Sequence, residues 1–173
     1  LPGMDIRLGC YYFPVMLDWD RSNWGVRPVD YLEPLLGYYD EALPEVADWH
    51  IKWAVDHGIS FFVFDWYFNQ GMDYLNDALE KGFMQSRFVD RMQFCVDWCN
   101  EGHCGQFKPV DFGHEALNDF ITTLCERYFS HPSYLRVDGK PVALIHVPLK
   151  IVNTHGDWDG CREALERMRD TAR

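Results

Sequence analysis

Two apolar runs along the chain end in almost the same polar sequence. Residues 62–69 read Phe-Val-Phe-Asp-Trp-Tyr-Phe-Asn, and residues 94–101 read Phe-Cys-Val-Asp-Trp-Cys-Asn-Glu. Runs without polar alternation are typical of strands that are buried on both faces of a parallel sheet. Because the carboxyl ends of parallel strands meet at one edge, we expect the polar groups of both runs to form a single rim where chemistry takes place.

The same reasoning predicts four strands in all. They cover residues 6–13, 59–66, 92–98 and 142–147. Pro14 supplies no amide donor and therefore ends the first of them. The dipeptide Asp138-Gly139 predicts a tight turn shortly before the fourth.

Helical periodicity fills the segments between these strands. Pro44 at a first helical position and Gly58 beyond the end predict a helix across residues 44–58. Apolar residues that recur on one face predict three more helices. The face of the first is formed by Met72, Leu75, Ala78 and Leu79, and this helix ends near Gly82. The face of the second is formed by Leu117, Phe120, Ile121, Leu124 and Tyr128, and that of the third by Cys161, Leu165 and Met168.

Four strand-helix units in succession predict an α/β fold with a parallel sheet covered by helices. No G-x-G-x-x-G follows any strand, which disfavours a dinucleotide-binding fold. A (β/α)8 TIM-type barrel takes about 250 residues, so residues 1–173 would form one partial domain, an N-terminal half-barrel. Its two edge strands would pair with a missing C-terminal half or with a second copy of the chain, unless the sheet is an open one.

A long segment without clear periodicity spans residues 15–43. It contains Trp19, Trp24, Tyr31, Tyr38 and Tyr39, together with several acids and prolines. Loops of this length are usually functional. The aromatic residues predict either a lid over a sugar site or a loop that packs its own side chains.

The charge and composition limit the classes of partner. A formal net charge of -11 argues against a nucleic-acid partner, because phosphate binding depends on clustered Lys and Arg. Aromatic residues beside carboxylates and amides suit an oligosaccharide or polysaccharide, whose ring faces stack while its hydroxyls form hydrogen bonds. No apolar run is long enough to predict a membrane span, and the start of the chain, at Leu1, does not indicate a compartment.

Six cysteines are spread along the chain without a C-x-x-C pair, which predicts mostly free, buried thiols. Cys99, His103 and Cys104 are candidate metal ligands by residue type, but their spacing does not match the usual zinc patterns. We therefore expect neither a metal nor another cofactor.

Several short motifs occur in an order that resembles the WbsX-like family of carbohydrate enzymes, which is related to the glycoside hydrolase family 99 endo-α-mannosidases and endo-α-mannanases. These motifs are residues 11–14 (YYFP), 37–40 (GYYD), 44–46 (PEV), 57–62 (HGISFF), 98–101 (WCNE), 131–134 (HPSY) and 138–142 (DGKPV). The resemblance implies a (β/α)8 barrel that acts on glycans.

The resemblance also implies where a sugar would bind. The residues carried over as substrate contacts are Tyr11, Tyr12, Trp66, Tyr67, Trp98, Asn100 and Glu101. The catalytic carboxylates of the family lie in an Asn-Glu-Trp-x-Glu element in the second half of the barrel, which this sequence does not contain, so no catalytic pair is carried over. The sequence also departs from the family at Asp65, and it lacks a Thr-Glu-Trp element between residues 15 and 43.

The residues themselves suggest candidates for acid-base chemistry. Asp65, Asp97 and Glu101 follow apolar runs and are candidate catalytic acids, although Asp65 and Asp97 could equally form ion pairs or helix caps. His146, near the end of the fourth strand, either faces the site or is a core histidine. Three functions remain open: a glycoside hydrolase that acts on mannose-type or related linkages, a non-catalytic glycan-binding or half-barrel assembly module, and a glycosyltransferase of polysaccharide biosynthesis.

Overall fold

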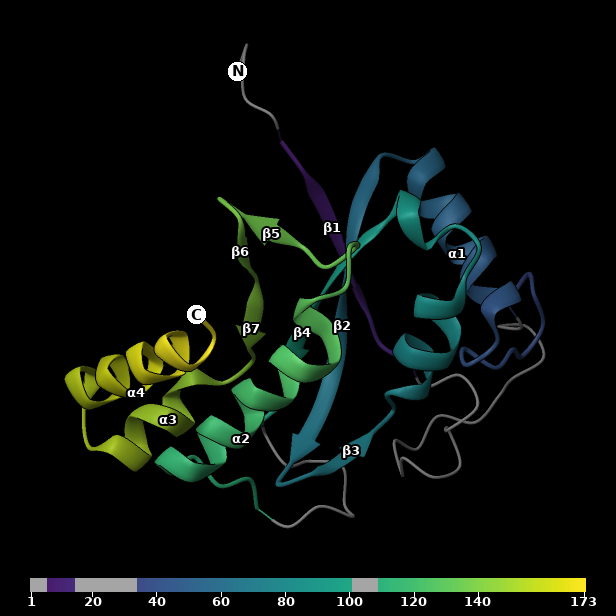
Figure 1. Cartoon of the computed structure of the whole chain (residues 1–173). Helices are drawn as coiled ribbons and strands as arrows, with labels where there is room; N and C mark the ends of the chain where they lie inside the picture. The colour runs from purple at the N-terminus through teal and green to yellow at the C-terminus, as the bar shows by residue number, and fades with distance from the viewer. Residues whose placement is uncertain (1–5, 15–33, 101–108) are drawn as a thin grey trace.

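The computed structural model describes residues 6–14, 34–100 and 109–173 of the chain. Its central element is a parallel sheet of strands β1 (Leu8–Tyr12), β2 (Ile59–Asn69), β4 (Gln93–Trp98) and β7 (Ala143–Ile145), in the order β1-β2-β4-β7. Each neighbouring pair in this order is parallel. The four predicted strands and the parallel sheet are therefore confirmed (Figure 1).

Helix α1 (Pro44–Asp56) begins and ends where the sequence predicts. Proline stands at its first position, and Gly58 follows its end at φ +80°, a conformation that favours glycine. Buried Asp48 ties the helix to a distant loop, because its carboxylate accepts a hydrogen bond from Ser86 Oγ at 2.6 Å and forms an ion pair with Arg87 Nε at 2.7 Å. The buried carboxylate of Asp48 is therefore paired with a positive charge.

The segment after β2 differs from the predicted helix of residues 72–82. Gln70 (φ 49°) and Gly71 (φ 77°) form a turn that reverses the chain, so that β3 (Met72–Tyr74) pairs antiparallel with the end of β2. Helical structure begins only with the π-helical turn η3 (Ala78–Gly82), followed by the short 3-10 segments η4 (Phe83–Gln85) and η5 (Val89–Arg91). The periodicity of Met72 and Leu75 was misleading because the turn precedes them.

The hydrophobic core fills the space between one sheet face and the helices. Helix α2 (His114–Leu124), continued by η6 (Cys125–Phe129), buries the predicted stripe against β2 and β4. Within this layer the Trp66 indole donates a hydrogen bond to the Tyr128 hydroxyl at 3.2 Å. The amphipathic stripe therefore identified the helix that covers the centre of the sheet.

The chain then forms a hairpin and two helices. Strands β5 (Arg136–Val137) and β6 (Lys140–Pro141) flank the predicted Asp138-Gly139 turn. Helix α3 (Pro148–His155) follows β7 and was not predicted, whereas α4 (Trp158–Thr171) was. Both helices lie beside α2 in Figure 1, at the end of the molecule away from α1. In the described ranges, no helix combines the length and apolar character needed to cross a membrane.

Candidate functional site

Along β2 and β4, the side chains of consecutive residues point to opposite sides of the sheet. Asp65 is paired with Asp97 and Trp66 with Trp98 in the register of these strands. The tryptophans face α2, as the contacts of both rings with Phe120 show. The two aspartates therefore occupy the opposite side. We call this side the acidic face; the predicted site residues on it are Tyr11, Asp65, Tyr67, Asp97 and His146, and Cys99 also lies there.

Tyr11 presents the most exposed aromatic ring of this group, with 60% of its surface accessible. Partial desolvation, followed by the negative charges of Asp97 and Asp65, raises the pKa of the Tyr11 hydroxyl. Tyr11 is in register with Val63, two residues before Asp65, so the side chains of Tyr11 and Asp65 lie on the same side of the sheet. An exposed aromatic ring beside carboxylates is an arrangement suited to a polyhydroxylated ligand.

Asp65 is a half-buried acid on the adjacent strand. Burial, and then repulsion from Asp97, raises the pKa of Asp65 to about 6, while His146 acts weakly in the opposite direction. Two carboxyl groups on neighbouring strands disfavour simultaneous ionisation. Asp65 can therefore hold a proton near neutral pH, as a general acid must.

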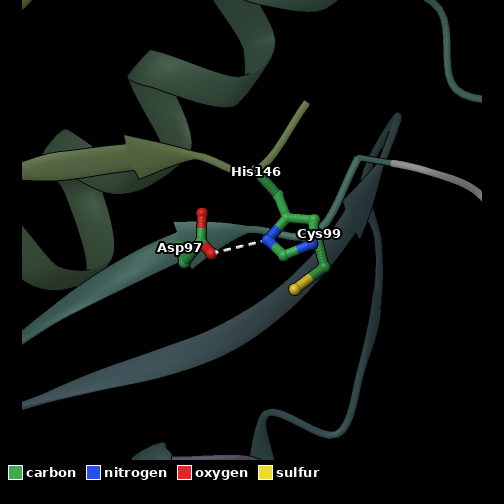
Figure 2. Close-up of side chains that lie close together, drawn as sticks. All are labelled: Asp97, Cys99 and His146. Atoms are coloured by element: carbon green, nitrogen blue, oxygen red, sulfur yellow. Dashed lines mark hydrogen bonds and ion pairs between the residues drawn. The ribbon is translucent and has the colours of Figure 1, made fainter. Parts of the chain in front are cut away.

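Asp97 is almost completely buried, with 1% of its surface exposed. Its Oδ2 atom lies 3.0 Å from Nδ1 of His146. Figure 2 marks this contact with a dashed line. Its Oδ1 atom is buried and has no hydrogen-bond partner among the described residues. Buried carboxylate oxygens are usually satisfied, so this acceptor is a candidate for contact with a ligand.

Asn100 fixes the strand that carries His146. Its amide nitrogen donates to the carbonyl oxygen of Val147 at 3.0 Å, and its amide oxygen accepts from the Val147 backbone at 2.8 Å. The backbone amide of His146 also donates to the Trp98 carbonyl at 3.1 Å. The predicted sugar contact Asn100 is therefore buried and holds β7 against β4 instead of facing the acidic face.

Cys99 completes a group that could hold a metal ion. One potential ligand atom each from Asp97, Cys99 and His146 lies within 4.8 Å of the other two (Figure 2). Burial and then the charges of Asp65 and Asp97 raise the pKa of the Cys99 thiol to about 12, against the opposing effect of a hydrogen bond with Tyr67. Sequence spacing did not indicate this group, because His146 comes from a different strand, 47 residues after Cys99.

Three other predicted contacts face the helices. Trp66 and Trp98 are each 1% exposed; the first stacks on Phe68 and the second on Phe120, with ring centroids 4.9 and 4.2 Å apart. Tyr12 forms a hydrogen bond of 2.8 Å with Nδ1 of His50 in α1. These placements correct the expectation that the three rings line the site. Strand alternation puts Trp66 and Trp98 on the side of the sheet opposite Asp65 and Asp97, and it puts Tyr12 on the side opposite Tyr11.

The remaining predictions divide between the acidic face and undescribed parts of the chain. Tyr67 lies on the acidic face, half-buried, with its ring 6.2 Å from that of Tyr74. Glu101, His103 and Cys104 lie outside the described residues, as does most of the aromatic loop of residues 15–43.

Comparison with known proteins identifies related sequences and folds. The family described as "Glycosyltransferase WbsX" matches residues 32–170. Two proteins named WxcX, from strains B100 and ATCC 33913 of Xanthomonas campestris pv. campestris, are each 29% identical over 140 residues. That match covers 74% of this chain but only 20% of either relative. The chain therefore spans about a fifth of the length of these curated relatives.

Two solved structures resemble the fold. A structure of the GH99 endo-alpha-mannosidase from Bacteroides thetaiotaomicron, in complex with bis-tris-propane, superposes with a TM-score of 0.54 at 19% identity, covering 83% of this chain and 42% of the enzyme. A second structure of that enzyme gives a TM-score of 0.52 at 17% identity, with 80% and 44% covered. The likeness shows a TIM-barrel-like α/β fold.

Proposed function

The chain belongs to the glycosyltransferase WbsX family, and we propose that it supplies the sugar-binding half of the barrel of a glycan-processing enzyme, a glycoside hydrolase that acts on mannose-type or related linkages. One observation carries the proposal. Asp65 and Asp97 are in register near the carboxyl end of the parallel pairing between β2 and β4, which stops at Trp66 and Trp98; this is the edge at which barrel enzymes bind their substrates. Four parallel strands and a match to 42% of a larger fold support the half-barrel.

The chemistry of the acidic face supports an oligosaccharide as the ligand. Carboxylate oxygens of Asp65 and Asp97 accept hydrogen bonds from sugar hydroxyls, and the exposed ring of Tyr11 offers an apolar surface to a sugar ring. Asp65, with its pKa raised to about 6, can either donate or accept such a bond near neutral pH. The imidazole of His146, 52% exposed, adds a further polar contact.

The proposal assigns binding to this half and bond cleavage to the other half. Glycoside hydrolysis usually needs two carboxyl groups on either side of the scissile bond. The family that the sequence resembles carries that pair in a later element. Asp65 and Asp97 would then hold the sugar in place for catalytic carboxylates that the second half of the barrel provides.

Binding measurements on the full-length protein test this assignment. Isothermal titration with an α-linked manno-oligosaccharide should show weaker binding for Tyr11→Ala and for Asp65→Asn, by about 1 kcal/mol each, the scale of one aromatic contact or one hydrogen bond. Trp158→Ala, at an exposed aromatic residue of α4, is the matched control and should bind normally. Unchanged affinity in both acidic-face variants would show that the oligosaccharide does not bind to the acidic face.

The family description favours glycosyl transfer as a second candidate function. The two reactions differ in their products. Incubation of the full-length protein with an oligosaccharide alone should release shorter sugars with new reducing ends if it is a hydrolase. Elongation that requires a nucleotide sugar would identify a transferase, and tight binding without either product would identify a glycan-binding module.

A further inference from the structure

We propose that Asp97, Cys99 and His146 form a binding site for a divalent transition-metal cation of the zinc class. Each residue offers one ligand atom, and the three atoms lie within 4.8 Å of one another. Around a tetrahedral zinc ion with bonds of about 2.0–2.3 Å, ligand atoms lie about 3–4 Å apart. The side chains therefore need only a small inward movement to surround the ion. This inference does not depend on the proposed function.

The backbone already holds the three residues in place. Asp97 and Cys99 are two residues apart at the end of β4, so that both side chains leave the same side of the strand. His146 lies opposite them for two reasons. Its backbone amide donates a hydrogen bond to the Trp98 carbonyl, and Asn100 forms hydrogen bonds with both backbone groups of Val147, the next residue. Ligands on a rigid sheet edge lose little conformational freedom on binding.

The buried carboxylate of Asp97 is the independent sign of a missing ligand. Its Oδ2 atom contacts the His146 ring, but its Oδ1 atom is buried without a hydrogen-bond partner among the described residues. A cation bound to this carboxylate would compensate a charge that is otherwise costly to bury. Asp65 is in register with Asp97 on the neighbouring strand, and when ionised it adds negative charge that favours a cation at this edge.

The donor set selects the kind of ion. Thiolate, imidazole and carboxylate together suit Zn²⁺ or Co²⁺, whereas Mg²⁺ and Ca²⁺ prefer oxygen ligands alone. Binding forms a metal-sulfur bond and displaces the Cys99 proton to solvent. The His146 side chain is 52% exposed, which leaves a route of entry and room for water or a ligand at the fourth position.

Cobalt titration of the full-length protein tests the site. Co²⁺ should produce a near-ultraviolet thiolate-to-metal charge-transfer band that Zn²⁺ abolishes in competition and excess Mg²⁺ does not. Cys99→Ser should remove the band, and His146→Ala and Asp97→Asn should each weaken Co²⁺ binding by at least about tenfold, the least that loss of a supporting residue costs metal sites. His146 is exposed, so its variant should fold normally; circular dichroism without metal checks each protein.

Two further cysteine variants serve as controls. Cys125 lies in η6 on the helix side of the sheet, and Cys104 is the next cysteine after Cys99 along the chain; each is replaced by serine. Both should keep the full band and affinity. A band that survives in Cys99→Ser, or that disappears in Cys104→Ser, would overturn the proposal, as would equal affinity in wild type and His146→Ala.

Discussion

Single residues on this sheet have roles that their neighbours in sequence do not share. Asp97 and Trp98 are adjacent, yet one faces His146 and the other is stacked 4.2 Å from Phe120 in the core. The Trp98 indole also donates to the Phe68 carbonyl at 3.0 Å. The pair therefore combines a site residue with a packing residue, and substitutions of the two should have different consequences.

Trp98→Ala should primarily reduce stability. We expect a loss of about 3–5 kcal/mol in the free energy of unfolding, the usual cost of truncating a buried tryptophan or phenylalanine. Urea denaturation followed by circular dichroism measures the change. The exposed Trp158→Ala should stay within about 0.5 kcal/mol of wild type. A stable Trp98→Ala protein with weakened glycan binding would instead make this ring a sugar platform.

The stability gained by Asp65→Asn should depend on pH. Folding raises the pKa of Asp65 from 3.8 to about 6, so the folded state binds the proton more tightly and ionisation of this group costs stability as pH rises through that range. Asparagine avoids the cost. After discounting for partial solvent screening, we expect a gain of about 1 kcal/mol at pH 7.5 and almost none at pH 4.

Urea denaturation at the two pH values, in the presence of a chelator, measures this difference. Asp90→Asn, at an exposed acid of η5, is the control and should change little at either pH. An equal effect of Asp65→Asn at pH 4 and pH 7.5 would show that Asp65 ionises normally in the folded protein.

At the scale of elements, the position of β7 depends on the side chain of Asn100 as well as on the backbone hydrogen bonds between β7 and β4. The strand has only three residues, and Asn100 extends its pairing with β4 by bonding both backbone groups of Val147. One asparagine thus acts as an additional strand residue. It also sets the position of His146, which precedes Val147.

Asn100→Ala should loosen this junction. Loss of the two hydrogen bonds leaves buried backbone groups without partners, which should cost about 1–3 kcal/mol. Hydrogen exchange of the Val147 amide, detected by nuclear magnetic resonance, should accelerate more than that of amides in β2. The exposed Asn153→Ala in α3 is the control. Unchanged protection at Val147 would mean that β7 holds its place without Asn100.

The elements that the sequence predicted correctly are those with a single dominant pattern. The apolar runs gave all four parallel strands, and the α2 stripe from Leu117 onward gave the helix that covers them. The hairpin at Gln70 was missed because its first residue has positive φ without being glycine. Asp97 and His146 were both candidate site residues, but their direct contact was not predicted, because strand register, which sequence spacing does not reveal, brings them together.

At the scale of the molecule, the sheet formed by residues 6–14, 34–100 and 109–173 has β1 and β7 as its two edge strands. Beside β7 lies an apolar cavity of about 530 Å³, lined among others by Phe120, Ile145, Leu165 and Met168. In the proposed half-barrel, further strand-helix units would cover this edge and this cavity. Without them, apolar surface and unpaired backbone groups are available for association.

A protein made of residues 1–173 alone should therefore associate. We expect light scattering to show dimers or larger species, with Ala143→Lys reducing the association because a lysine on an edge strand opposes pairing. Ala143 is exposed on β7, so this change should not disturb the core. Glu163→Lys, on the exposed side of α4, introduces the same residue away from the edge and should leave association unchanged. A monodisperse 173-residue monomer would favour a self-sufficient open sheet.

The strand order β1-β2-β4-β7 has a consequence for how the protein is made. Each parallel strand pairs with the one synthesised before it, and no later strand inserts between two earlier ones. During translation, β2 can pair with β1 and β4 with β2 as soon as each leaves the ribosome. The nascent chain can therefore build its sheet in the direction of synthesis, with β7 as the growing edge.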